Sequence, residues 1–212
     1  MLILIVLASY LLGSFPTSIV VGKALKGIDI RQYGSGNAGA TNAFRVLGPA
    51  AGVFVFAIDL AKGMVAVLVL TRLASSSFPI NLELLRILTA VAVISGHIWT
   101  VFAGFKGGKG VGTAAGALLA LAPVEVAIAF GVWAVVTFYS GYVSLGSLSA
   151  AVTLPLCLGI GKLALNRSVS LEFLVFACLL AGLIILTHRT NIRRLLRGEE
   201  NRFGSRNSKG NQ

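Results

Sequence analysis

The sequence is poor in the side chains on which most catalytic and metal-binding sites depend. Its 212 residues include only seven Asp and Glu, two His and two Cys, and charged residues make up 12%, against about 25% in soluble domains. Cys157 and Cys178 lie in apolar runs and have neither metal-ligand spacing nor a disulfide pattern. The sequence therefore predicts no metal site and no cofactor, and it favours both cysteines as small hydrophobic residues.

Apolar residues are abundant instead. They make up 56% of the chain, and the mean hydropathy is +0.89, which is the composition of an integral membrane protein. The net charge of +11 does not indicate a nucleic-acid partner, because no basic domain interleaved with aromatic residues is present. In a membrane protein such a charge reports orientation and contact with anionic lipid.

The apolar runs predict an all-α integral membrane fold with seven spans, one of them short. The spans are residues 2–21, 46–71, 87–105, 111–124, two from 126–161, and 169–187. Pro16 is expected to kink the first span, and the run 126–161 is too long for one helix, so it should break at residues 139–142. The run 111–124 would cover only about 21 Å of a hydrocarbon core of about 30 Å. A re-entrant fourth segment, giving six spans, stays open.

The distribution of positive charge favours seven spans. That topology places thirteen of the 18 Lys and Arg residues on one face, four on the other, and Lys62 inside a span. The excess predicts that the first face is cytoplasmic. Residues 1–198 are expected to form a single polytopic membrane domain. Residues 199–212 are polar and lack apolar periodicity, so a disordered cytoplasmic tail is expected there.

The first of three cytoplasmic motifs covers residues 34–45. It contains G-x-G-x-x-G, but a membrane span on either side excludes the strand–helix context of a dinucleotide site. Its small and polar residues leave hydrogen-bond donors accessible, and the candidates for substrate contact are Ser35, Gly36, Asn37, Thr41 and Asn42. Thr41 or Asn42 is expected to cap the second span, which puts Arg45 in the first helical turn beside a bound anion. The alternative is a basic loop with glycine turns.

The second motif, Lys106-Gly107-Gly108-Lys109-Gly110, resembles a P-loop, but a glycine follows Lys109 where a hydroxyl would hold Mg²⁺. Nucleotide hydrolysis is therefore disfavoured. The glycines are expected to expose amide groups that bind phosphate or carboxylate together with the lysines. The alternatives are lysines that only mark the cytoplasmic side and, for His97, a satisfied polar residue within a span.

The third motif covers residues 188–199. If the last span continues as a helix, His188 and Asn191 share one face, from which they can donate hydrogen bonds to a substrate; an amphipathic helix held at the interface by arginines is the alternative. Asp59 and Lys62, three residues apart inside a span, are expected to form a structural ion pair.

Taken in order, the three motifs resemble the bacterial acyl-phosphate:glycerol-3-phosphate acyltransferase family, the PlsY type, over residues 2–201. The resemblance implies seven helices in the bacterial cytoplasmic (inner) membrane and an active site facing the cytoplasm. It implies transfer of a fatty acyl group from acyl phosphate to glycerol 3-phosphate, which yields lysophosphatidic acid and phosphate. Trp99-Thr100 departs from the Phe-Pro that is common in members.

The resemblance also implies residue roles. Catalytic roles fall to Ser35, Arg45, His188 and Asn191, glycerol-phosphate binding to Lys106, Gly107, Gly108, Lys109 and Gly110, and a structural role to Glu199. The implied partners are acyl phosphate, glycerol 3-phosphate, membrane lipid and, as a candidate, the enzyme that supplies acyl phosphate.

No His is followed five positions on by Asp, because Phe102 and Arg193 stand at those positions. Without such a dyad, we expect direct, substrate-assisted transfer in which phosphate oxygens accept the proton. An acyl-Ser35 intermediate is the rival mechanism. An anion or phosphate-ester transporter and a structural lipid-binding protein are the alternatives outside the enzymes.

Overall fold

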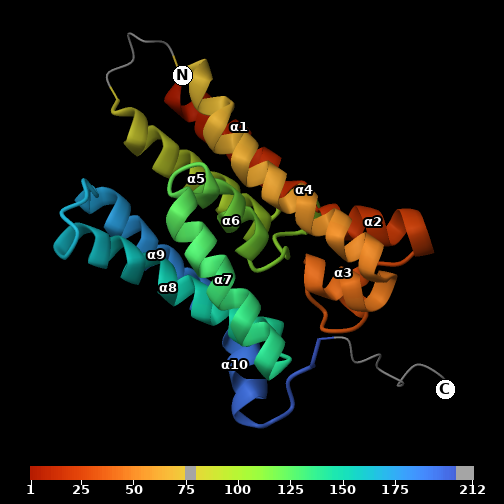
Figure 1. The fold of residues 1–212 in the computed structure, drawn as a ribbon. Helices are drawn as coiled ribbons and strands as arrows, with labels where there is room; N and C mark the ends of the chain where they lie inside the picture. Colours follow the sequence, from red (N-terminus) through yellow and green to blue (C-terminus); the bar gives the residue numbers. More distant parts are fainter. Residues whose placement is uncertain (75–79, 204–212) are drawn as a thin grey trace, which may run out of the picture.

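The computed structural model describes residues 1–74 and 80–203, and within these residues the protein is helical and contains no β-strand (Figure 1). The α-helices are α1 (Leu2–Ser14), α2 (Thr17–Lys26), α3 (Ala40–Leu47), α4 (Pro49–Leu68), α5 (Leu82–Ile98), α6 (Val111–Leu119), α7 (Pro123–Ser140), α8 (Val143–Leu163), α9 (Leu171–Thr187) and α10 (Arg189–Leu196). Three short 3₁₀ helices are η1 (Ile30–Gln32), η2 (Leu70–Leu73) and η3 (Val101–Ala103).

Five segments of the described chain are long and apolar enough to cross a membrane. They are Leu2–Lys26, Pro49–Leu73, Leu82–Ala103, Pro123–Ser140 and Val143–Leu163. Helices α9 and α10 make a sixth if the pair, bent by 60°, counts as one span. Helix α6 has nine residues and is therefore only about 14 Å long. The predicted break within 126–161 is confirmed, since α7 ends at Ser140 and α8 begins at Val143.

Pro16 interrupts the first span, as predicted. Helix α1 ends at Ser14, and α2 begins at Thr17 and continues to Lys26, beyond the expected end of this span. The interruption leaves backbone carbonyls without helical partners. Lys62 Nζ on α4 donates to two of them, Gly13 O at 3.3 Å and Phe15 O at 2.9 Å. A buried cation therefore satisfies the end of α1.

The second span begins differently from the prediction. Residues 40–47 form the separate helix α3, and Gly48, with φ +103°, divides it from α4. Neither Thr41 nor Asn42 caps the span. The span begins at Pro49, a residue that suits the first helical turn, and Gly48 is its N-cap. Arg45 lies in the last turn of α3, where the helix dipole favours a cation, and not in the first turn of the span.

Glycines allow the central helices to cross in backbone contact. A Cβ on Gly63 of α4 would lie 2.1 Å from Thr113 O, and one on Gly116 of α6 would lie 1.9 Å from Leu60 O. Between α1 and α5, Gly13 and Gly96 make crossings of the same kind. Such contacts are typical of membrane helices, where small residues replace the hydrophobic effect as the basis of packing. The short α6 is thus held firmly against α4.

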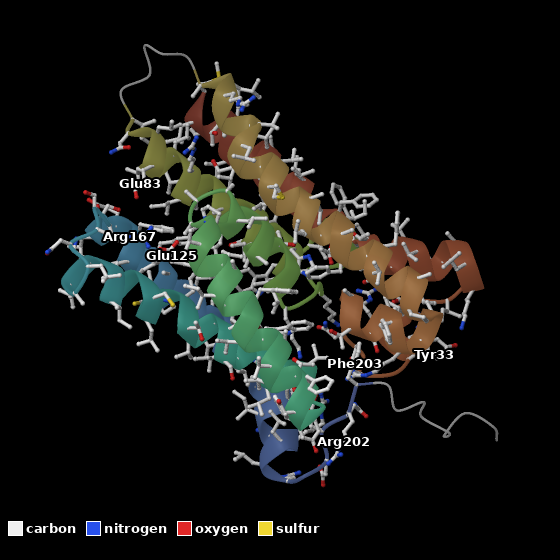
Figure 2. The ribbon with its side chains drawn as sticks, viewed as in Figure 1. Tyr33, Glu83, Glu125, Arg167, Arg202 and Phe203 are labelled. Atoms are coloured by element: carbon white, nitrogen blue, oxygen red, sulfur yellow. The ribbon has the colours of Figure 1, made fainter. Side chains whose placement is uncertain are left out.

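The polar segments gather at two ends of the helix bundle. Figure 2 shows Glu83, Glu125 and Arg167 at one end and Tyr33, Arg202 and Phe203 at the other. At the first end, Arg167 pairs with the buried Glu125, and Ser170 donates to Glu83 at 2.9 Å. Helices α2, α3 and α10 lie at the opposite end of the bundle from the N-terminus (Figure 1). All three sequence motifs belong to that opposite end.

The first residues of the expected tail are part of the fold. Glu200 is buried, the ring of Phe203 lies 4.7 Å from that of Phe44, and Phe203 N donates to Gly141 O at 2.7 Å. The sequence predicts that the packed domain ends at residue 198. In the structure, residues up to Phe203 still contact the helices. Residues 204–212 of the expected tail lie outside the described residues.

Candidate active site

The first motif forms a loop organised by Asn42. This side chain is 1% exposed, and its Oδ1 accepts from Ser35 N at 2.9 Å. Its Nδ2 donates to Ile30 O at 3.1 Å and Tyr33 O at 3.0 Å. Because three hydrogen bonds to backbone engage the amide, Asn42 holds the loop and does not face a substrate.

The other candidates of this motif remain accessible. Ser35, Asn37 and Thr41 are half-buried, and Gly36 is exposed with φ +73°. The hydroxyl and amide groups of these residues can therefore reach a ligand, whereas Asn42 cannot without releasing the loop. The sequence predicted substrate contact for all five residues. The structure assigns Asn42 to holding the loop and leaves the other four as possible contact residues.

Two of the three glycines of the second motif, Gly107 and Gly108, do not expose their amides, contrary to the prediction. Gly107 N donates to Ile98 O at 3.0 Å, and Gly108 N donates to His97 O at 3.1 Å. A Cβ on Gly107 would lie 2.0 Å from His97 O. These glycines therefore let the loop fold tightly onto the end of α5, and their N–H groups are engaged within the protein. The lysines on either side are left to contact an anion.

Thr100 organises the turn before Lys106. Its hydroxyl donates to Ser14 O, and its carbonyl accepts from Phe105 N at 2.8 Å. Phe105 takes the left-handed conformation with φ +60°. The threonine thus closes the turn by hydrogen bonds.

The two lysines of the second motif point into different environments. Lys106 is exposed, whereas Lys109 is half-buried and its Nζ donates to Asn191 Oδ1. Burial lowers the pKa of Lys109 to about 8, an effect that Glu200 opposes and that the positive charges of Arg194 and Arg45 reinforce. Lys109 is therefore a cation at neutral pH that loses its proton in mildly alkaline solution.

The carboxylate at the centre of the site is Glu200. Its Oε1 accepts from Asn191 Nδ2 at 2.7 Å and from Ser144 at 3.1 Å, and its Oε2 accepts from Arg194 at 2.7 Å. Burial raises the pKa of Glu200, but these hydrogen bonds outweigh it and hold the pKa below the usual value. The sequence predicts the structural role for Glu199, whereas Glu199 is exposed. Two adjacent glutamates gave no sequence signal for choosing between them.

Arg45 completes the cationic group from the side of α3. Its Nη2 donates to Asn201 O at 3.2 Å, while its buried Nε has no hydrogen-bond partner within the described chain. Burial lowers the pKa of Arg45, and Glu200 opposes that effect. Arg45, Lys109 and Arg194 thus surround one carboxylate and leave a surplus of positive charge, which suits an added anion.

His188 lies buried at the junction of α9 and α10. Its Nδ1 is 2.8 Å from Ile184 O. A carbonyl only accepts, so Nδ1 carries the proton, and the neutral ring keeps Nε2 as an acceptor. Thr187 donates to Lys109 O at 3.3 Å and ties this junction to the second motif.

Side-chain hydrogen bonds link the segments that carry the three motifs. Lys109 and Asn191 join the second motif to the third, and Arg45 of the first motif reaches Asn201 beyond the third. Arg31, which precedes the first motif and which the sequence analysis did not single out, reaches the second, because its Nη1 donates to Ala103 O at 2.8 Å and to Lys106 O at 3.4 Å.

An apolar cavity of about 80 Å³ opens between α6, α7, α8 and α9. Its lining includes Val111, Leu118, Leu154 and Ile184, together with several alanines. Val111 follows the second motif directly, and Ile184 lies four residues before His188. The cavity therefore begins beside the cationic group. Within residues 1–74 and 80–203, no three His, Cys, Asp or Glu residues group together to hold a metal ion.

A sequence model described as "Glycerol-3-phosphate acyltransferase" matches residues 3–198, a range that contains the first two motifs and all of the third except its last residue. The chain belongs to the glycerol-3-phosphate acyltransferase family. It is 45% identical over 226 residues to the glycerol-3-phosphate acyltransferase of Chlorobaculum tepidum, an alignment that covers 96% of this chain and 97% of the relative.

Two solved structures are similar throughout the fold. The crystal structure of PlsY, an integral membrane glycerol 3-phosphate acyltransferase, in its glycerol 3-phosphate form has a TM-score of 0.84 and 41% identity, and 96% of each chain is covered. Its lysophosphatidic acid form has a TM-score of 0.81 and 40% identity, with 96% of this chain and 95% of that chain covered.

Family membership confirms the resemblance and the enzymatic function. The protein is a multi-pass bacterial membrane enzyme, a glycerol-3-phosphate acyltransferase of phospholipid synthesis. The comparisons favour this function over the transporter alternative. The roles of the individual site residues stay predictions.

Proposed function

We propose that the enzyme transfers a fatty acyl group from acyl phosphate to glycerol 3-phosphate at the cytoplasmic face of the inner membrane, releasing lysophosphatidic acid and phosphate. The observation that carries this proposal is the convergence of Arg45, Lys109 and Arg194 from three segments around one carboxylate. The glycerol 3-phosphate and lysophosphatidic acid forms of PlsY support the acceptor and the product.

The residue roles follow from exposure and charge. Exposed Lys106 and the partly unsatisfied Arg45 hold phosphate groups, and Lys109 stabilises charge that develops during transfer. Ser35, His188 and Asn191 orient the acceptor hydroxyl and the carbonyl of the donor. Further contacts come from the accessible residues of the first motif, Gly36, Asn37 and Thr41. Gly107, Gly108 and Gly110 shape the loop that presents the two lysines.

The scarcity of protein bases supports an activated donor. The glycerol hydroxyl oxygen attacks the acyl carbonyl carbon, and the bond between that carbon and the bridging phosphate oxygen breaks. The hydroxyl proton passes to an oxygen of the departing phosphate. This balance requires no covalent intermediate and no strong base, and the protein acts by position and charge.

The apolar cavity between α6, α7, α8 and α9 supports a fatty acyl group as the transferred unit. Its lining is almost entirely hydrocarbon, and it includes Val111, which follows the second motif, and Ile184, whose carbonyl oxygen lies 2.8 Å from His188 Nδ1. A chain of CH₂ groups fits such a space without desolvating polar atoms. The product can leave sideways into the bilayer.

We further propose a single membrane domain in which the chain crosses the bilayer seven times. The end of α5 contacts the second motif, because Gly107 N donates to Ile98 O. The first turn of α7 contains Glu125. Glu125 and its partner Arg167 lie at the opposite end of the bundle from Arg202 and Phe203 (Figure 2). Helix α7 then returns to Gly141, which accepts from Phe203 N. Between the second motif and the start of α7, the chain therefore runs from one end of the bundle to the other through α6. This supports counting α6 with its flanking residues as a crossing.

The test is an assay of purified protein in sealed vesicles with radiolabelled glycerol 3-phosphate. We expect label in the lipid phase with acyl phosphate, and none with an acyl thioester. Turnover only with the thioester would contradict the proposed donor, and label retained in the vesicle lumen would indicate transport. Recovery of a kinetically competent acyl-Ser35 species in a single turnover would contradict direct transfer.

A further inference from the structure

A cluster of buried polar side chains lies beneath the Lys106–Gly110 loop and has no part in the function proposed above. Each member is less than a tenth exposed, and together they come from α2, α4, α5 and α6. The members are Thr17, Asp59, Lys62, His97 and Thr113. A cavity of about 10 Å³ is lined by three of them, Thr17, Asp59 and His97, and also by Gly107 and Gly108.

Asp59 is the centre of this cluster. Its Oδ1 lies 2.9 Å from Lys62 Nζ, which confirms the predicted ion pair. The same oxygen accepts from Thr17 Oγ1 at 3.0 Å and lies 3.7 Å from His97 Nδ1. One carboxylate thereby links three helices, and it presents a negative charge to the imidazole ring.

His97 connects this cluster to the loop. On one side, its Nδ1 lies 3.1 Å from Thr113 Oγ1. On the other side, a Cβ placed on Gly108 would lie 2.2 Å from Nε2, so the loop backbone rests directly on the ring. Gly108 N also donates to His97 O at 3.1 Å. No side chain larger than hydrogen fits between the ring and the loop.

Stability alone does not account for these charges. A buried ion pair is often no more stabilising than apolar residues of the same volume, and Gly63 and Gly116 already hold α4 against α6. What the cluster adds is a fixed ring under the segment that carries both lysines.

We propose that His97 is a positioning residue: Asp59 and Thr113 fix its ring, and the Nε2 side of the ring sets the height and direction of the Gly107–Gly108 turn and hence of Lys106 and Lys109. This inference rests on the proposed role of that loop in binding the phosphate of glycerol 3-phosphate. Positioning of this kind acts on the KM of that substrate.

A matched pair of variants separates the two sides of the ring. In His97→Gln the amide takes the place of Nε2, so the contact with the loop is kept. In His97→Asn the amide takes the place of Nδ1, so the contact with Thr113 is kept and the space under Gly108 is emptied. We expect His97→Asn to raise the KM for glycerol 3-phosphate about 10-fold and His97→Gln less than about 3-fold, with the KM for the acyl donor nearly unchanged in both.

Three outcomes would overturn the proposal. They are equal KM values in both variants, a larger rise in His97→Gln than in His97→Asn, and a change confined to the unfolding temperature. The KM for glycerol 3-phosphate can be measured with any acyl donor that the wild-type enzyme accepts. Rejection of acyl phosphate by the wild type would therefore contradict the proposed donor and leave this test intact.

Thr113 offers a second pair if the His97 variants do not accumulate in the membrane. Thr113→Ser keeps the hydroxyl that faces Nδ1, whereas Thr113→Val keeps the shape of the side chain and removes that hydroxyl. We expect only Thr113→Val to raise the KM for glycerol 3-phosphate, by about 3-fold or more. An unchanged KM in both Thr113 variants would contradict the positioning role.

Discussion

Lys109 and Asn191 stand 82 positions apart in the chain, and Lys109 Nζ donates a hydrogen bond to Asn191 Oδ1. The amide of Asn191 donates in turn to Glu200 at 2.7 Å. Lys109 in a loop, Asn191 on α10 and Glu200 are thus connected in series by hydrogen bonds. We expect a substrate phosphate that binds Lys109 Nζ to compete with Asn191 for this hydrogen bond.

The pH dependence of the enzyme should report the charge of Lys109. Its pKa is lowered to about 8, so the cation is present below that pH and is lost as the pH rises through it. We expect kcat/KM to fall above about pH 8. Lys109→Arg is the control, because a guanidinium stays charged at these pH values; any activity left in this variant should be flat there. An equal alkaline fall in both proteins would assign the titration to another group.

Lys106→Ala should mainly raise the KM for glycerol 3-phosphate. Lys106 is exposed, so its removal leaves no buried group unpaired and should not change stability. Loss of one cation–phosphate contact corresponds to about 1.5–3 kcal/mol, or roughly 10- to 100-fold in KM. Lys23→Ala, at an exposed position on α2, is the matched control. Steady-state kinetics check the prediction, and an unchanged KM in Lys106→Ala would contradict its role.

Glu200 and Glu199 should behave differently when each is changed to Gln. Glu200 accepts from Ser144, Asn191 and Arg194, and its neutralisation leaves the half-buried cations Arg45, Lys109 and Arg194 without their counter-charge. We expect Glu200→Gln to lower the unfolding free energy by about 1–3 kcal/mol and to reduce kcat/KM. Glu199→Gln should match the wild type. Thermal unfolding in detergent and kinetics are the measurements; equal effects would show that Glu200 has no special role.

Asn42 and Asn37 should separate loop stability from substrate contact. Asn42→Ala removes three hydrogen bonds to backbone and should lower the unfolding free energy by about 1–3 kcal/mol. Asn37→Ala should leave the unfolding temperature unchanged and lower kcat/KM. The two variants are compared by thermal unfolding and by kinetics. A stable Asn42→Ala protein would contradict the assigned role of Asn42.

The topology can be tested by labelling single cysteines in sealed vesicles. In a background lacking Cys157 and Cys178, cysteines at positions 35, 109 and 191 should all react from the same side, because one pocket requires it. A cysteine in place of Leu165, exposed after α8, should react from the other side. Labelling of positions 35, 109 and 191 from different sides would exclude the shared site.

Some features were predictable because their physical cause is local. The membrane class follows from runs of apolar residues, and the break after Pro16 follows from a missing N–H. The ion pair of Asp59 and Lys62 follows from a spacing of one helical turn inside an apolar segment. The three motifs also identified the segments of the site, since glycines and cations beside hydrocarbon need an aqueous or anionic partner.

Other features depend on neighbours that are distant in sequence. Gly107 and Gly108 looked like amide donors for an anion, but their partners are carbonyls of α5. Asn42 looked like a cap or a substrate contact, and the structural role was predicted for Glu199, whereas the buried carboxylate is that of Glu200. In each case the sequence showed that the group can form hydrogen bonds. The packing of the loops determined which donor or acceptor became its partner.

The amino-acid sequence alone determined the family, the membrane class and the three cationic segments, because hydropathy and glycine-rich motifs act over short stretches of chain. The tertiary structure decided that α3 is a helix of its own, that Glu200 is the central carboxylate and that His97 lies under the loop. These features depend on hydrogen bonds between helices and loops that are distant in sequence. Buried polar groups are hydrogen-bonded in folded proteins, and the tertiary structure determines which partner is within reach.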